Sequence, residues 1–70
     1  MDRIPVGSSN VASVGYDAET QTLEIEFQSG GVYQYMNVPQ DAYDELMASP
    51  SKGSYISQNI KNRYPYSRTG

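Results

Sequence analysis

The chain has 70 residues, a formal net charge of −3, and neither cysteine nor histidine. These absences exclude disulfides, cysteine-ligated zinc and histidine-dependent acid–base catalysis. Leu, Ile, Val and Phe together account for only twelve residues, so the seven tyrosines must supply much of the apolar area. We therefore expect one small folded domain with a tyrosine-rich core, of a size that often gains stability by forming homo-oligomers.

The hydropathy of the sequence indicates where in the cell the protein is expected. No apolar segment reaches the ~18–20 residues of a membrane span, and no signal-peptide pattern follows Met1. The expected location is therefore cytoplasmic, with no membrane partner.

The charges are divided unevenly along the sequence. Residues 1–48 hold all eight acids and one base, whereas residues 49–70 hold four bases and no acid. Three tyrosines lie among those bases, and interleaved cations and rings suit a ligand with phosphates and flat bases. The alternative is a basic tail that pairs loosely with the acidic body. Because the pI is near 4.5, long duplex DNA is not an expected partner.

The first predicted elements are an arm and two strands. Residues 1–7 are expected to form a flexible arm. Alternating residues predict a strand over Val11–Tyr16, with Ala12, Val14 and Tyr16 on one face, and a second strand over Thr22–Phe27. Because the second strand alternates apolar and polar residues, it indicates an antiparallel sheet with one wet face.

A glycine-rich turn and a third strand follow. The segment Ser29–Gly31 predicts a tight hairpin, and Val32–Val38 predicts the strand after it. A three-residue loop would place Tyr33 and Tyr35 on the core face, whereas a two-residue loop would place Gln34 there. We favour the three-residue loop because it leaves Gln34 out of the core.

The second half of the chain predicts two short helices. Pro39 suits the first turn of a helix that ends at Ser49-Pro50. Its apolar stripe is Ala42, Tyr43, Leu46 and Met47. Ser51 can cap a second helix that runs to about Ile60, and residues 67–70 are expected to fray. The predicted fold class is α+β: a three-stranded antiparallel β-meander followed by two short α-helices packed on one face, in the order β-β-β-α-α.

The order of short motifs along the chain resembles that of a known family. These motifs are Gly15-Tyr16-Asp17, Leu23-Glu24-Ile25-Glu26-Phe27, Gly30-Gly31-Val32-Tyr33-Gln34-Tyr35, Ser51-Lys52-Gly53-Ser54-Tyr55 and Tyr64-Pro65-Tyr66. Together they are similar to the KTSC domain, which is named for its occurrence at the C-terminus of some lysyl-tRNA synthetases and also occurs alone in short bacterial and phage-type proteins. The resemblance covers residues 8–66, which we take as the domain.

What this resemblance implies about activity is limited. RNA binding has been suggested for the family from its synthetase context, which is an association and not a mechanism. Nothing else in the chain resembles a synthetase, so aminoacylation is not expected.

The first candidate site is Ser51-Lys52-Gly53. If Ser51 caps a helix, the free N–H groups that follow it and the cation of Lys52 could hold one phosphate. Gly53 would let a ligand approach the backbone closely. The alternative is a plain helix cap whose glycine packs against the sheet.

The second candidate is the pair Tyr33 and Tyr35. Facing solvent, the two rings could stack bases. The alternative, which the loop argument favours, makes both of them core rings with hydroxyls at the rim. In an intermediate arrangement the ring walls would line a groove beside the second helix.

The third candidate is the basic, tyrosine-rich C-terminal segment, because arginine both clamps phosphate and stacks on rings. Its residues are Lys61, Arg63, Tyr64, Tyr66 and Arg68. Packing on a second subunit is an alternative role for it. Taken together, the candidate ligand-binding residues are Tyr33, Tyr35, Ser51, Lys52, Gly53, Tyr55, Lys61, Arg63, Tyr64 and Tyr66.

Glu24 and Glu26 share the wet face of the second predicted strand. Paired carboxylates can hold a hard cation or carry out acid–base chemistry, but such a face is usually a solvated surface. No nucleophile–base pair is visible in the sequence. We therefore expect neither an enzyme nor a bound metal or cofactor.

These observations lead to two functional hypotheses. The first is a non-catalytic module that binds a nucleotide or a short RNA. Tyrosines would stack the bases, and Lys, Arg and a helix N-terminus would hold the phosphate. In a phage-type protein such a module could sequester a signalling nucleotide. The alternative is a protein–protein adaptor or small homo-oligomeric domain that uses Met36, Met47 and surplus tyrosines as its contact surface.

Overall fold

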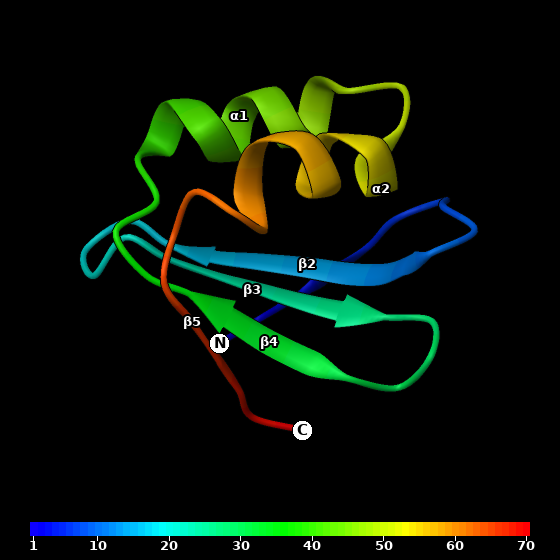
Figure 1. The fold of residues 1–70 in the computed structure, drawn as a ribbon, viewed down its shortest axis with the longest axis horizontal. Helices are drawn as coiled ribbons and strands as arrows, with labels where there is room; N and C mark the ends of the chain where they lie inside the picture. The colour runs from blue at the N-terminus through cyan, green and yellow to red at the C-terminus, as the bar shows by residue number, and fades with distance from the viewer.

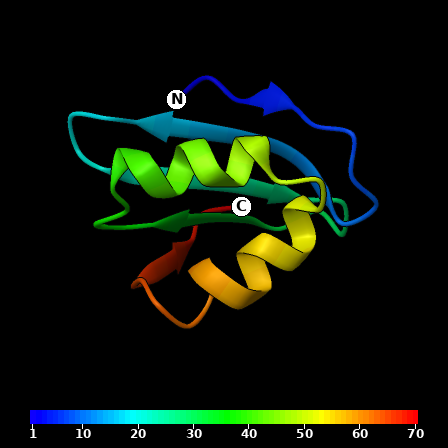
Figure 2. The ribbon, with the colours of Figure 1, turned by 90° about the horizontal axis from the view of Figure 1, so that it is seen from above.

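The strands of the computed structural model, which describes residues 1–70, follow one another in chain order across a single antiparallel sheet. The strands are β1 (Ile4–Pro5), β2 (Val11–Asp17), β3 (Thr22–Phe27), β4 (Val32–Tyr35) and β5 (Tyr66–Arg68). The helical segments are α1 (Gln40–Ala48), α2 (Lys52–Tyr55) and the π-helical turn η1 (Ile56–Ile60). Both α1 and the continuous α2–η1 segment lie on the same side of the sheet (Figures 1 and 2). The predicted α+β class is confirmed.

The predicted number of strands is wrong: the sheet has five strands and not three. The segment predicted to be a loose arm contributes β1, where Ile4 lies opposite Val14. Two residues of the segment predicted to fray, Ser67 and Arg68, belong to β5, where Arg68 lies opposite Tyr33. These edge strands have two and three residues. Strands this short cannot display the alternation on which a sequence prediction rests.

A bulge at Ala12 shifts the core face of β2. Val11 lies opposite Phe27 and Ser13 lies opposite Glu26, so Ala12 is an extra residue on its strand. Val11 is therefore fully buried like Val14, whereas Ala12, which the alternation placed on the same face as Val14, is only half-buried. The alternation of apolar and polar residues in the sequence does not reveal a bulge of this kind.

The β3–β4 connection has the three-residue loop that the sequence favoured. The N–H of Phe27 donates to the carbonyl of Gly31 at 2.9 Å, and Gly30 adopts a φ of +103°. In this register Tyr33 and Tyr35 share the face of Ile25 and Leu23. The strand is shorter than predicted. It ends at Tyr35 and does not reach Val38, since Asn37 has a φ of +62° that breaks the extended backbone.

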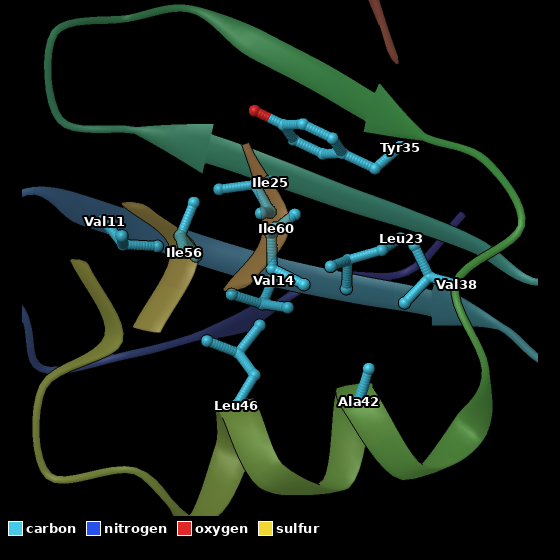
Figure 3. Packing of buried hydrophobic residues seen from close by; sticks show 10 residues of the cluster. All are labelled: Val11, Val14, Leu23, Ile25, Tyr35, Val38, Ala42, Leu46, Ile56 and Ile60. Atoms are coloured by element: carbon cyan, nitrogen blue, oxygen red, sulfur yellow. The ribbon is translucent and has the colours of Figure 1, made fainter. Parts of the chain in front are cut away.

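The core lies between the sheet and the helical segments (Figure 3). It consists of Val11, Val14, Leu23, Ile25, Tyr35, Val38, Ala42, Leu46, Ile56 and Ile60. Tyr35 is the one tyrosine inside it, and five others pack around it half-buried: Tyr16, Tyr33, Tyr43, Tyr55 and Tyr64. The tyrosines therefore form mainly the rim of a small aliphatic core.

The second helical segment begins as predicted and ends in a wider turn. The hydroxyl of Ser51 accepts a hydrogen bond from the N–H of Ser54 at 3.4 Å, which confirms the cap. At the other end, the N–H of Lys61 donates to the carbonyl of Ile56 at 2.9 Å, a bond that spans five residues. Ile56 and Ile60 face the core. No helix of this fold has the length and apolar character needed to cross a membrane.

Candidate functional site

An aromatic groove opens where η1 meets the β3–β4 hairpin and β5. It has a volume of about 420 Å³ and is lined by Phe27, Ser29, Tyr33, Tyr35, Lys61, Asn62 and Tyr66. Four of the predicted site residues meet here: Tyr33, Tyr35, Lys61 and Tyr66. We refer to this surface as the aromatic groove.

The sheet register positions the rings of this groove. Tyr33 and Tyr35 are two residues apart on β4, so their side chains project from the same face. Tyr66 lies opposite Tyr35 on β5 and shares that face. The centroid of the Tyr66 ring is 5.7 Å from that of Tyr33 and 5.6 Å from that of Tyr35. These ring planes are tilted by 50° and 40°, so the rings do not cover one another's faces.

Tyr35 forms the floor of the groove. The residue is only 3% exposed, and burial raises the pKa of its phenol. Its hydroxyl makes no hydrogen bond within the protein, yet no buried polar atom lacks a partner. The hydroxyl must therefore be open to the groove. Tyr35 thus combines a core ring with an accessible polar tip, which is the intermediate arrangement considered for these tyrosines.

A second, polar groove lies beside the first. It has a volume of about 490 Å³ and is lined by Ser9, Asn10, Phe27, Gln28, Ser29, Gly53, Ser57 and Lys61. Phe27, Ser29 and Lys61 line both grooves. Ser57 and Lys61 follow the core residues Ile56 and Ile60 by one position, so the helical spacing places both on the groove side of η1. We refer to this surface as the polar groove.

Lys61 is the cation at the junction of the two grooves. Its ammonium nitrogen lies 5.5 Å from the centroid of the Phe27 ring. Every ion pair in the structure involves Arg3, so none of the four bases in residues 49–70 is paired with a carboxylate. No acidic residue lines either groove. The alternative of a basic tail that pairs with the acidic residues of the body is therefore wrong, because the C-terminal bases form no such ion pairs.

The predicted Ser51-Lys52-Gly53 cluster is divided by the fold. The Lys52 ammonium donates to the carbonyl of Ser49 at 2.7 Å, and neither Ser51 nor Lys52 lines a groove. Gly53 lines the polar groove, where a Cβ would come within 3.1 Å of the Asn10 amide nitrogen. This arrangement fits the alternative of a helix cap with a closely packed glycine.

The remaining predicted residues also lie outside the grooves. The hydroxyl of Tyr55 donates to the carboxylate of Glu45 at 2.8 Å and so links α2 to α1. Burial and this carboxylate raise the pKa of Tyr55 to about 12. Tyr64 packs half-buried against the core, and Arg63 is exposed. Arg68, by contrast, lies over the Tyr33 ring, 5.7 Å from its centroid.

The opposite face of the sheet carries a bonded polar network, not a solvated acidic surface. Glu24 is only 7% exposed and accepts from Arg3 at 2.6 Å and from Gln34 at 2.8 Å. Ser13 accepts from Arg3 and donates to Glu26. The bond from Gln34, and then the bond from Arg3, hold the pKa of Glu24 below its ordinary value despite burial. The expectation of two solvated carboxylates is wrong for Glu24.

The sequence prediction missed part of each groove. The missed residues are Ser9, Asn10, Phe27, Gln28, Ser29, Ser57 and Asn62. Most of them lie in loops whose proximity depends on the tertiary fold. The spacing of Ser57 and Lys61 is the one local signal, because residues four apart share a side of a helix.

Comparisons with known proteins place the chain in a family. Residues 7–64 match the KTSC domain. The chain belongs to the KTSC domain family. A crystal structure of a KTSC domain protein from Yersinia pestis superimposes with a TM-score of 0.96 at 39% sequence identity, covering 99% of this chain and 97% of that one. The sequence resemblance and the observed topology therefore agree.

The KTSC domain also occurs in relatives of different size. A protein of Stutzerimonas stutzeri strain A1501, described as uncharacterized, is 41% identical over 64 residues, which cover 91% of this chain and 90% of that protein. A lysine–tRNA ligase of Trichormus variabilis is 47% identical over 51 residues, which cover 73% of this chain but 9% of the ligase. The domain thus corresponds to a small part of the ligase.

Proposed function

We propose that this KTSC domain binds a nucleotide, either free or within an unpaired RNA segment, and that it does so without catalysing a reaction. One observation carries the proposal: the aromatic groove brings an exposed ring, a phenol hydroxyl and an ammonium free of any carboxylate together in one concavity. Its volume of about 420 Å³ lies within the range of small-molecule sites.

Tyr66 is the ring best placed to stack a base. It is 58% exposed and lies tilted above the floor that Tyr35 provides. Stacking a base on an aromatic side chain contributes about 1–3 kcal/mol. The neighbouring Tyr33 ring is instead occupied by the Arg68 guanidinium. Tyr33 therefore supports the groove wall and keeps a cation beside it.

Lys61 is the phosphate-binding group in this proposal. It is exposed, unpaired with any carboxylate, and shared by both grooves. A lysine ammonium binds phosphate as a compact point charge. The net charge of −3 disfavours a long polyanion, so a ligand of one or a few nucleotides fits better than a duplex.

The ligase relatives provide a supporting context for an RNA ligand. A lysine–tRNA ligase carries a segment 47% identical to this domain. Association with an enzyme that acts on tRNA is consistent with a base-stacking groove, although shared architecture alone does not assign a function. The main support for nucleotide binding is the lining of the aromatic groove.

Amide chemical-shift mapping tests the proposal. The probes are the four ribonucleoside 5′-monophosphates and single-stranded oligouridylate and oligoadenylate. We expect saturable shifts concentrated on Ser29, Tyr33, Lys61, Asn62 and Tyr66, and loss of those shifts in Tyr66→Ala. The absence of shifts with every probe, or shifts confined to the Arg3–Glu24 face, would overturn the assignment. Saturation by the monophosphates indicates a free nucleotide as the ligand, whereas saturation by the oligonucleotides alone indicates an RNA segment.

A further inference from the structure

The two grooves together point to a more specific ligand. Resting on the proposed function, we infer that the domain recognises two nucleotides joined by one phosphodiester. In this assignment the first base enters the aromatic groove and the linking phosphate lies at Lys61. The second nucleoside occupies the polar groove.

The two grooves are adjacent, because Phe27, Ser29 and Lys61 line both of them. A ligand that extends past these three residues would contact both concavities. Their volumes are about 420 and 490 Å³, each within the range of small-ligand sites. A mononucleotide in the aromatic groove would leave the second concavity unused.

The polar groove is lined mainly by neutral polar residues. Phe27 is its one apolar lining residue. The side-chain amide of Asn10 and the hydroxyls of Ser9 and Ser57 make no hydrogen bond within the protein, whereas polar groups on the opposite sheet face bond to one another. Neutral donors and acceptors of this kind match ribose hydroxyls and the edge of a base.

Lys61 carries the positive charge at the junction of the two grooves. Lys61 is the only basic residue lining either groove, and it lines both. A single ammonium suits a single phosphate that bridges the two grooves. A triphosphate would require several cations or a metal ion to balance its charge. The position of Lys61 therefore favours a phosphodiester link.

The test compares pairs of ligands that carry the same phosphodiester charge. Uridylyl-(3′,5′)-uridine is titrated against uridine 3′-methylphosphate, which keeps the diester but lacks the second nucleoside, and the adenine pair is titrated in the same way. We expect the dinucleotide to bind at least tenfold tighter in one of the two series. Ser57→Ala and Asn10→Ala should each reduce that ratio at least threefold.

The outcomes separate this inference from the proposed function. Equal affinity for both members of each pair would overturn the dinucleotide assignment and leave nucleotide binding intact. A tenfold preference that Ser57→Ala and Asn10→Ala both leave unchanged would also overturn it, because the second nucleoside would then lie elsewhere. If no nucleotide probe binds at all, the proposed function fails and this inference fails with it.

Discussion

The guanidinium of Arg3 reaches across β2 and lies 2.6 Å from the carboxylate of Glu24 on β3. The strand between them carries Gly15, which lies opposite Glu24 in the sheet. A Cβ at Gly15 would come within 2.6 Å of the Asp2 carbonyl oxygen and 3.1 Å of the Arg3 Cγ. The missing side chain is therefore what allows the N-terminal segment to pack on β2 and neutralise a buried acid.

Gly15→Ala should displace the N-terminal segment and break the Arg3–Glu24 pair. A charged group that loses its buried partner typically costs about 1–3 kcal/mol, and partial rehydration of Glu24 keeps the loss within that range. Urea unfolding measures the change. Gly7→Ala is the matched control, since nothing lies within 4 Å of a Cβ there. Equal stability of the two variants would contradict this account of Gly15.

The loss of folding stability at acid pH should depend on Glu24. Its pKa is lowered in the folded state by the Gln34 hydrogen bond and by Arg3. Ionised Glu24 therefore contributes stability above its ordinary pKa of about 4.5, and this contribution is lost as pH falls through the lower folded value.

Unfolding free energies between pH 3 and pH 7 check this prediction. Glu24→Gln should flatten the acid limb of the stability curve, whereas Glu19→Gln, at an exposed position, should leave it as in the parent protein. An unchanged slope in Glu24→Gln would show that other carboxylates govern the acid response.

Tyr55 should act through structure and not through ligand contact. Its hydroxyl joins α2 to Glu45 of α1, and its pKa is raised to about 12. The stabilising effect of the protonated phenol is present below the ordinary pKa of 10 and is lost as pH rises through about 12. Tyr55→Phe should cost about 0.5–1 kcal/mol of stability at pH 7.

Two measurements test the assignment of Tyr55. Phenolate absorbance against pH should lose its latest-ionising component in Tyr55→Phe, and nucleotide affinity should stay within twofold of the parent. A large loss of affinity together with normal stability would instead place Tyr55 in the site.

Much of the fold could be predicted from the sequence because its central elements have local signals. The alternation in β3 and the three-residue loop set the faces of Tyr33 and Tyr35, and Ser51 marked a helix start. The edge strands β1 and β5 could not be found in this way. Their pairing depends on tertiary contacts, such as the packing of Asp2 over Gly15.

The candidate site was only partly predictable for a related reason. Composition drew attention to tyrosines and bases, and the fold does gather Tyr66, Tyr35 and Lys61 in one groove. The same reasoning overvalued Lys52, whose ammonium is held by a local carbonyl. It also overlooked Asn10, because no sequence pattern shows that this loop lies beside Gly53.

The central claim is tested most directly by comparing two lysines. Calorimetric titration with the four ribonucleoside 5′-monophosphates is carried out on Lys61→Ala, Lys52→Ala and the parent protein. Lys61 lies at the groove junction, whereas the Lys52 ammonium is bound to the Ser49 carbonyl. Both variants remove one positive charge, so a non-specific electrostatic effect would be the same in each.

We predict that Lys61→Ala weakens the best-binding nucleotide at least about tenfold, which corresponds to about 1.4 kcal/mol, and that Lys52→Ala stays within twofold of the parent. The salt dependence of binding should also become shallower in Lys61→Ala alone, because a phosphate contact is lost. Equal losses in the two variants, or no loss in Lys61→Ala, would contradict a phosphate-binding role for the groove.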